Sequence, residues 1–262
     1  MNHPHKVALM AAIAAGKEIL KVYDTSFKVM VKEDASPLTL ADQNANEVIN
    51  SHLQKTDIPI ISEENKQIPF SERKDWDLCW IVDPLDGTKE FVKRNGEFTV
   101  NIALVEKGKP TLGVIYVPVT RELYFTSPSG QKSFKKVIDE EESYDSILEN
   151  AMELCPQSLA NPVKIVGSRS HLNEDTRGYI SKIENEHEVE IVSKGSSLKF
   201  CLVAEGNAHL YPRFAPTMEW DTAAGQAICE AVGVSVINQE TGKPMVYNKE
   251  NLLNPYFLVA VS

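Results

Sequence analysis

Two carboxylates flank a proline in the sequence IVDPLDGTKEF. Asp83 and Asp86 are three residues apart, at the point where the apolar run of a predicted strand ends. Pro84 restricts Asp83 to extended backbone, and Gly87 permits an unusual backbone angle, so both carboxylates can converge on one point. Thr88 offers a hydroxyl beside them. Since an ordinary Asp-Gly turn uses the same residue types, this stretch alone is compatible with a turn and with a metal site.

Other carboxylates follow or precede apolar segments in the same way. Glu63 and Glu64 come after the apolar segment 58–61, and Asp221 precedes the residues TAAG. Paired glutamates are usually surface charges, and Asp221 could simply cap a helix. If these side chains meet, a hard cation such as Mg²⁺ would relieve their repulsion, because it binds oxygen ligands. A bound metal would also attract a phosphate, so magnesium-dependent phosphoester hydrolysis is the leading hypothesis.

The composition is that of a globular protein. The 262 residues are 42% hydrophobic, enough for one large domain or two smaller ones, and the net charge of −10 disfavours nonspecific binding to nucleic acids or anionic membranes. The four cysteines form no C-x-x-C pair, which predicts reduced thiols in a cytosolic protein. The N-terminal apolar stretch continues at helical spacing, so we interpret it as an amphipathic helix rather than a signal peptide. No apolar run is long enough to span a bilayer.

The elements that must position the carboxylates are a mixture of helices and strands. Thr39 and Asp42 fit a capping box at the start of a second helix. Apolar strands are predicted at 58–61 and 78–82, with the chain turning after the latter, and antiparallel strands follow over 99–125. The acidic stretch 129–162 is interpreted as a solvated face or connector. Beyond it an alternation predicts an α/β second half: strand 163–166, helix 172–185, strand 188–192, helix 196–205, strand 208–211, helix 222–232 and strands near 234–237 and 256–261.

A possible anion-binding region lies in the second half. Gly195, Ser196 and Ser197 open a predicted helix whose free N–H groups would favour an anion. Lys199 lies near Ser196 on that helix, and Arg213 could form a forked contact with a phosphate. The alternative is that Lys199 is an ordinary solvated helix charge.

Three motifs in this order resemble the signatures of the inositol monophosphatase-like, lithium-sensitive phosphatase superfamily. They are ISEEN, VDPLDGTKEF and EWDTAAG, and the resemblance covers nearly the whole chain. It implies a layered αβαβα sandwich of the inositol monophosphatase and fructose-1,6-bisphosphatase type, an α+β or α/β fold. Residues 1–160 would then form an N-terminal α+β part carrying most metal ligands. Residues 161–262 would form a C-terminal α/β part with the nucleotide contacts and Asp221.

The resemblance also implies roles for individual residues. Two or three Mg²⁺ ions would be held by Glu63, Asp83, Asp86, Asp221 and the backbone carbonyl of Leu85. A water molecule would be oriented or deprotonated by Thr88 and Asp42, with Asp86 as a further catalytic residue, and Glu64 would lie farther out. The motif residues would also touch the substrate, namely Glu63, Leu85, Asp86, Gly87, Thr88 and Asp221.

Within the superfamily, Lys89-Glu90-Phe91 after the D-G-T motif resembles the 3′(2′),5′-bisphosphate nucleotidase branch, the bacterial form of which serves sulfur assimilation. This implies hydrolysis of the 3′-phosphate of adenosine 3′,5′-bisphosphate, with 3′-phosphoadenylyl sulfate as a further candidate, and inhibition by lithium. The nucleotide contacts implied are His171, Ser196, Lys199 and Arg213.

Three other readings remain open. The first, an inositol or sugar phosphatase of the same superfamily, is the alternative closest in structure. The second is a non-catalytic metal- or nucleotide-binding regulator, and the presence of both Asp42 and Thr88 argues against it. A haloacid dehalogenase-type phosphatase would need its two aspartates two positions apart, whereas Asp83 and Asp86 are three apart. We expect a small nucleotide as substrate, no nucleic acid partner, no integral membrane anchor and a monomer or homodimer. We expect a cytoplasmic location, with peripheral attachment to the inner membrane left open.

Overall fold

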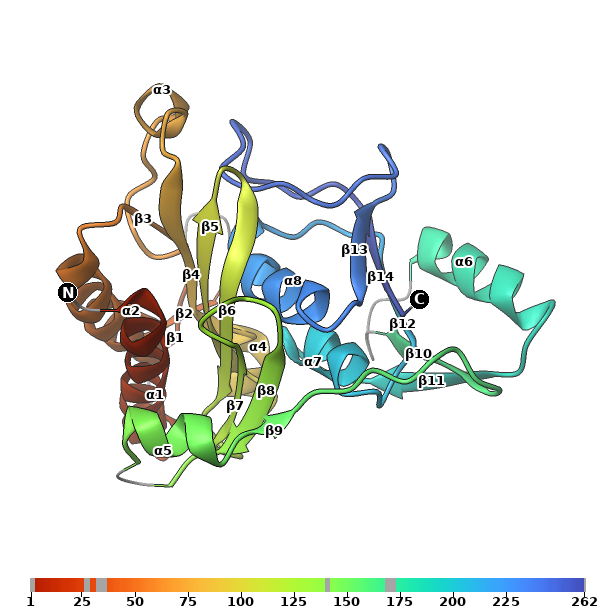
Figure 1. Cartoon of the computed structure of the whole chain (residues 1–262), viewed down its shortest axis with the longest axis horizontal. Coiled ribbons are helices and arrows are strands. Elements are labelled where there is room, and N and C mark those ends of the chain that lie inside the picture. Colours follow the sequence, from red (N-terminus) through yellow and green to blue (C-terminus); the bar gives the residue numbers. More distant parts are fainter. Residues whose placement is uncertain (1–2, 26–28, 32–36, 140–141, 168–172, 262) are drawn as a thin grey trace.

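Helices and sheets alternate in layers in the computed structural model, which describes residues 3–25, 29–31, 37–139, 142–167 and 173–261. From one side to the other, the order is α1 with α2, a seven-stranded sheet, α7 with α8, a five-stranded sheet, and α6 (Figure 1). The implied αβαβα sandwich is therefore confirmed. Among the described residues, no helix has both the length and the apolar character needed to cross a membrane.

The seven-stranded sheet carries its strands in sequence order. β3 and β4 are parallel, and every other neighbouring pair is antiparallel. The strands are β3 (Ile60–Ser62), β4 (Leu78–Asp86), β5 (Thr99–Glu106), β6 (Lys109–Val117), β7 (Glu122–Thr126), β8 (Ser133–Val137) and β9 (Met152–Glu153). Helices α1 (Pro4–Tyr23), α2 (Leu40–Leu53) and α5 (Tyr144–Glu149) bury one apolar cluster against its outer face.

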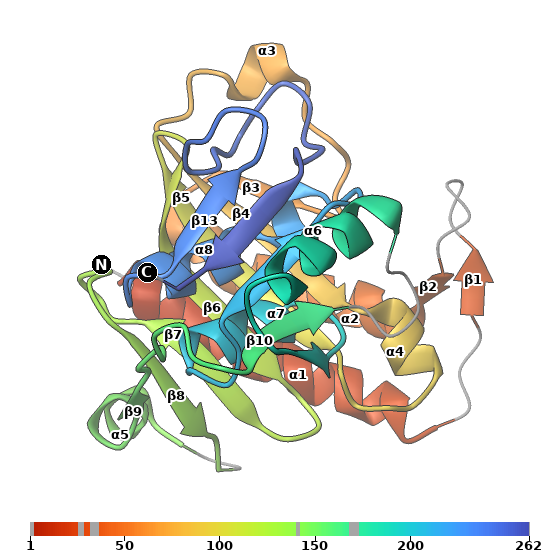
Figure 2. The same cartoon turned by 90° about the vertical axis from the view of Figure 1, so that its right-hand side faces the viewer.

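The five-stranded sheet has the order β11-β10-β12-β14-β13, so its strands are not in sequence order. Its strands are β10 (Val163–Gly167), β11 (Val189–Ser193), β12 (Leu210–Arg213), β13 (Ser235–Asn238) and β14 (Phe257–Ala260). Helix α6 (Glu174–Glu184) packs on its outer face through a small apolar cluster. The remaining short elements are β1 (Val29–Val31), β2 (Pro37–Thr39), η1 (Gln54–Thr56), α3 (Phe70–Arg73), α4 (Thr88–Val92) and η2 (Glu219–Asp221), with β2 beside α2 and α4 (Figure 2).

Helices α7 (Leu198–Ala204) and α8 (Ala223–Glu230) fill the space between the two sheets. The approach of α8 to the first sheet depends on Gly113 of β6, since a Cβ there would lie 2.3 Å from the carbonyl oxygen of Ala224. Backbone contact of this kind lets α8 rest directly on β6. It also brings η2, which immediately precedes α8, close to the end of β4.

Most of the predicted elements are confirmed, including the N-terminal helix, the antiparallel strands and the α/β alternation of the second half. The four cysteines are free. The predicted division at residue 160 falls between the two sheets, and the independence of the two parts stays a prediction. The capping box of Asp42 involves the Thr39 side chain, which lies outside the described part of the structure.

Two expectations need correction. The strand predicted to end at residue 82 continues as β4 to Asp86, with a register shift between Asp83 and Asp86. Pro84 has no N–H for the ladder, so the pairing is interrupted there and resumes at Asp86 rather than ending. The stretch 129–162 is more than a connector, because β8, α5 and β9 extend the first sheet and its cover.

Candidate active site

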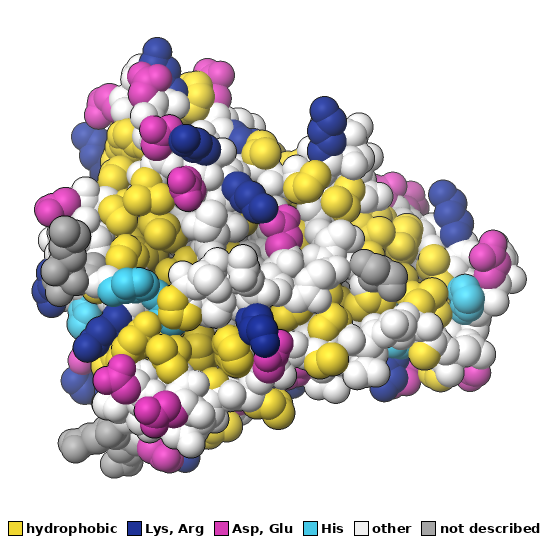
Figure 3. All heavy atoms as spheres, in the orientation of Figure 1, with side chains coloured by type: hydrophobic (Ala, Val, Ile, Leu, Met, Phe, Trp, Pro, Cys, Tyr) yellow, Lys and Arg dark blue, Asp and Glu magenta, His cyan; other side chains and the backbone are white. Residues whose placement is uncertain are grey.

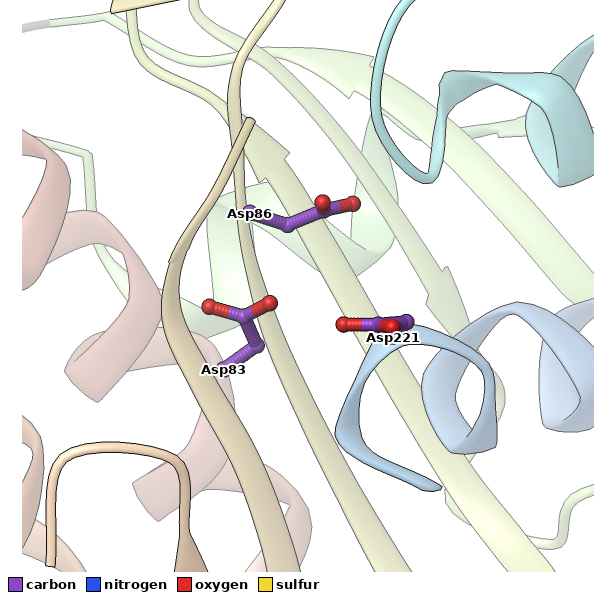
Figure 4. Close-up of side chains that lie close together, drawn as sticks. All are labelled: Asp83, Asp86 and Asp221. Carbon is purple, nitrogen blue, oxygen red and sulfur yellow. The ribbon is translucent and has the colours of Figure 1, made fainter. Parts of the chain in front are cut away.

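Three carboxylates meet where the end of β4 faces the turn η2. Asp83 and Asp86 come from β4, and Asp221 comes from η2 (Figure 4). Each offers one oxygen atom, and these three atoms lie within 4.8 Å of one another. The structure therefore brings together three of the residues that the sequence motifs singled out, although 135 residues separate Asp86 from Asp221 along the chain.

The irregular end of β4 fixes the first two carboxylates. Asp83 accepts a hydrogen bond from the backbone N–H of Leu85, at 3.1 Å from its Oδ1. Gly87, at φ 91°, adopts the left-handed conformation that glycine favours and starts the short helix α4. The hydroxyl of Thr88 then donates to the carbonyl oxygen of Leu85 at 3.4 Å. The bulge thus places Leu85's carbonyl and Thr88's hydroxyl together beside Asp86.

Asp221 is held by its own turn and by a buried neighbour. Its Oδ2 accepts from the backbone N–H of Met218 at 2.7 Å. Glu219, two residues earlier, is fully buried and accepts from the backbone N–H groups of Asn248 at 2.6 Å and Lys249 at 3.0 Å. The ammonium group of Lys249 lies 2.5 Å from the same carboxylate. This buried ion pair fixes the turn that presents Asp221.

The electrostatics of the cluster favour a cation. Burial raises the pKa of Asp83 well above its ordinary value, and the neighbouring carboxylates of Glu63, Asp86 and Asp221 raise it further. Burial and then the charge of Asp86 raise the pKa of Asp221 to about 7. Closely spaced carboxylates resist ionisation because each charge is desolvated and repelled by the others. An oxygen-rich set of this kind fits a hard divalent cation, which would supply the missing positive charge.

Two further carboxylates predicted from the sequence lie close enough to act on the charge of Asp83. Asp42, near the start of α2, is buried, and its charge also raises the pKa of Asp83. Glu63 follows β3, donates its backbone N–H to the carbonyl of Val82 at 3.2 Å, and contributes more strongly to the same shift. Glu64 is half-buried beside it. Asp42 and Glu63 are therefore near the cluster, while their roles stay predictions.

The cluster opens into a cavity of about 520 Å³. Asp86, Gly87 and Asp221 line it together with Ser196, Lys199 and Arg213. Three of the four predicted nucleotide contacts thus share a cavity with the carboxylates. The fourth, His171, lies outside the described residues.

Lys199 and Arg213 make few hydrogen bonds to the described residues. Lys199 donates to the carbonyl oxygen of Ser196 at 2.7 Å and lies 5.7 Å from the ring centroid of Tyr211. Burial lowers the pKa of Lys199 to about 8. Arg213 donates from Nη2 to the carbonyl of Pro216 at 3.2 Å, while its buried Nε has no acceptor among the described residues. An anion entering the cavity would satisfy these groups.

The sequence reasoning missed several residues of the site. Lys89 of α4, Lys93 directly after it and Lys194 also line the cavity. The i, i+4 spacing of Lys89 and Lys93 could have placed both on one face of a helix, had α4 been predicted. Ser197 donates to Asp86 Oδ2 at 2.7 Å and accepts from Asn101. No local pattern signals that contact, because the partners are far apart in sequence.

Comparisons with known proteins agree with this architecture. Residues 2–256 match the family model of the inositol monophosphatase family. The curated 3′(2′),5′-bisphosphate nucleotidase CysQ of Shigella flexneri is 46% identical over 252 residues, covering 94% of this chain and 95% of that protein. The protein of the same name from Escherichia coli K12 is 44% identical with the same coverage.

Solved structures show the same relationship. A crystal structure of CysQ from Bacteroides thetaiotaomicron, described as a bacterial member of the inositol monophosphatase family, superposes with a TM-score of 0.89. It is 47% identical, and the match covers 99% of this chain and 98% of that one. The Thermotoga maritima inositol monophosphatase has a TM-score of 0.73 at 23% identity, covering 97% and 90% of the two chains, which shows a shared fold.

Proposed function

The chain belongs to the inositol monophosphatase family and is a phosphatase, and we propose that its substrate is adenosine 3′,5′-bisphosphate. In this proposal it removes the 3′-phosphate to give AMP and inorganic phosphate, and 3′-phosphoadenylyl sulfate is a second substrate. The relatives that are 44–46% identical over almost their whole length are named bisphosphate nucleotidases, which supports this choice over an inositol or sugar phosphate.

The observation that carries the proposal is that metal-binding carboxylates and buried cationic groups share one cavity. Asp86 and Asp221 of the acidic cluster line it together with Lys199 and Arg213. Acidic and basic side chains are also interspersed on the face shown in Figure 3, but at the surface, whereas Lys199 is buried. A substrate with two phosphates can place the reacting one at the carboxylates, with a cation between, and the other at the basic groups.

The carboxylate end would hold the metal on which enzymes of this family depend. We propose two or three Mg²⁺ ions held by Glu63, Asp83, Asp86, Asp221 and the carbonyl of Leu85. When bound, the metal supplies water activation and stabilisation of the leaving oxygen. The bulge in β4 and the buried Glu219 turn keep these ligands in place before the metal arrives.

The chain's own residues then direct the reaction. We propose that Thr88 and Asp42 orient a water molecule and accept its proton while its oxygen attacks the 3′-phosphorus. The bond between phosphorus and the ribose oxygen breaks, and that oxygen leaves to take up a proton. No covalent enzyme intermediate forms. At the other end, Ser196, Lys199 and Arg213, with His171, hold the phosphate that is not cleaved.

Phosphate release tests the substrate assignment directly. We expect Mg²⁺-dependent release from adenosine 3′,5′-bisphosphate, with a higher kcat/KM than for inositol 1-phosphate or fructose 1,6-bisphosphate, and inhibition by lithium. A higher kcat/KM on either of the latter two substrates would overturn the assignment. Lys199→Met should raise KM for the bisphosphate about tenfold, because it removes a charged hydrogen-bond donor. Lys182→Met, on α6, is the matched control and should leave KM unchanged.

Two other experiments test the aspartyl-phosphate mechanism and the metal assignment. Hydrolysis of a substrate whose 3′-phosphate is chiral through oxygen isotopes should invert the configuration at phosphorus, because water displaces the ribose oxygen in one in-line step. Retention of configuration would indicate two displacements through an aspartyl-phosphate instead. Asp86→Asn should weaken Mg²⁺ binding and abolish phosphate release. Near-normal turnover by that variant would refute the metal assignment. We propose that the protein is cytoplasmic and forms a monomer or homodimer. Sedimentation of the purified protein tests the oligomeric state.

A further inference from the structure

A continuous chain of hydrogen bonds joins Ser196, a proposed contact of the second phosphate, to the carboxylate of Asp86. Ser196 Oγ lies 2.7 Å from Thr99 Oγ1, which lies 3.0 Å from Asn101 Oδ1. Asn101 Nδ2 lies 2.8 Å from Ser197 Oγ, which lies 2.7 Å from Asp86 Oδ2. Thr99, Asn101 and Ser197 are all buried, which limits the competition of water for these bonds.

The direction of every bond in the chain follows from the charge at its end. Asp86, as a carboxylate, can only accept, so Ser197 uses its single proton to donate. Asn101 must therefore donate to Ser197 and turn its carbonyl oxygen toward Thr99. Thr99 then donates to Asn101, which leaves Ser196 as the donor to Thr99. A flipped Asn101 amide would place a third acceptor at Ser197, beside Asp86 Oδ2 and the carbonyl of Asp221, for one hydroxyl proton.

Ser197 also ties this chain to the second half of the metal site. Its hydroxyl lies 3.0 Å from the backbone carbonyl of Asp221 as well as 2.7 Å from Asp86. Because Ser197 and Asn101 both approach Oδ2 of Asp86, the other oxygen of that carboxylate is left for a cation. The position of Ser197 thus sets which way Asp86 faces.

Ser196, in the loop before α7, and Lys199, at the start of α7, are two proposed phosphate contacts. Ser196 has φ 47°, a left-handed conformation that is uncommon for serine, and its carbonyl is held by Lys199 Nζ at 2.7 Å. An anion on the cavity side of this loop would accept from the ammonium of Lys199, which holds the carbonyl of Ser196, and so would restrain Ser196 with its hydroxyl against Thr99. Occupation by a phosphate therefore stabilises the hydrogen bonds that fix Ser197.

We propose that Ser197 is a positioning residue that couples the contacts of the non-cleaved phosphate to the orientation of the metal ligand Asp86. The inference rests on the proposed function. It implies that the second phosphate raises kcat and cation affinity, beyond adding to substrate affinity, because a correctly oriented Asp86 is needed in the transition state. Coupling between two ligands is reciprocal, so AMP, which carries only the non-cleaved phosphate, should tighten Mg²⁺ binding.

The test measures Mg²⁺ binding without turnover, from the unfolding temperature as a function of Mg²⁺ concentration, with and without AMP. In the wild type, AMP should tighten Mg²⁺ binding about fivefold, at the lower end of typical coupling. Ser197→Ala should weaken Mg²⁺ binding about tenfold and abolish the AMP effect. Thr99→Val, nearly isosteric, cuts the chain one step from Ser196 and should abolish the AMP effect with a smaller loss of Mg²⁺ affinity.

Ser133→Ala is the matched control, since Ser133 is equally buried and donates one hydrogen bond, to the carbonyl of Ile228 at 2.9 Å. It should retain the AMP effect. On turnover, Ser197→Ala should lower kcat for adenosine 3′,5′-bisphosphate more than kcat for adenosine 3′-monophosphate. An AMP effect of equal size in the wild type and Ser197→Ala would overturn the inference while leaving the proposed function intact. Failure of AMP to bind the wild type would instead refute the nucleotide function, and the inference with it.

Discussion

Asp221→Asn should stabilise the metal-free protein while removing its stabilisation by Mg²⁺. Burial, followed by the charge of Asp86, raises the pKa of Asp221 from 3.8 to about 7. Between these values the folded state keeps a proton that the unfolded chain releases, so the free energy of unfolding falls as the pH rises. At about 1.4 kcal/mol per pKa unit, the ionised carboxylate costs about 4 kcal/mol above pH 7. Asparagine removes this cost and can still accept from Met218.

The assay is thermal unfolding at about pH 8, where the full cost applies, with a chelator and again with Mg²⁺. In chelator the variant should unfold roughly 10 °C above the wild type, since about 1 kcal/mol corresponds to 2–4 °C in a chain of this size. Mg²⁺ at about 100 times its dissociation constant should stabilise the wild type by about 2.7 kcal/mol. The variant, which lacks one ligand charge, should gain much less.

Asp75→Asn is the matched control because it removes the same charge from an exposed position. Its free energy of unfolding should change by less than about 0.5 kcal/mol in either condition. The reasoning is refuted if Asp221→Asn is less stable than the wild type in chelator. It is refuted equally if Mg²⁺ stabilises both proteins to the same extent.

Three further changes test the fold around the site. His5 is buried and hydrogen-bonded through both ring nitrogens, and burial lowers its pKa to about 4. As the pH falls, the unfolded chain therefore binds the extra proton before the folded protein does. The free energy of unfolding, measured in urea, should fall by about 3 kcal/mol between pH 6.5 and pH 4. His5→Gln should largely remove this pH dependence, and an unchanged dependence in that variant would contradict the argument. Arg73→Met leaves three backbone carbonyls without their buried donor, so the free energy of unfolding measured in urea should fall by about 3 kcal/mol. A fall of less than about 0.5 kcal/mol would contradict this role of Arg73. Gly113→Ala should push α8 away from β6 and so reduce the Mg²⁺-dependent shift in unfolding temperature. Gly178→Ala is the control, because a Cβ there meets nothing within 4 Å, and it should leave that shift unchanged. Equal shifts in both variants would contradict the role of Gly113 in placing α8 against the sheet.

The sequence predicted the elements whose signals are local. The apolar runs and their period identified most strands and helices, because burial of one face leaves a pattern in neighbouring residues. The motifs around Asp83, Asp86 and Asp221 indicated carboxylates at the ends of apolar segments, and the structure brings these three together. The sequence could not show the continuation of β4 past Pro84, since pairing with β5 rather than local preference keeps that strand in the sheet.

What only the tertiary structure decided is how distant segments share groups. The contact of Gly113 with α8 and the hydrogen bonds from Asn101 to Ser197 and on to Asp86 join residues about 100 positions apart. Such contacts leave no periodic trace, because each is a single side chain or a missing Cβ. The residue types of the acidic cluster were therefore readable from the sequence alone. The packing of α8 between the sheets determined that they meet, because it places the turn of Asp221 against the end of β4.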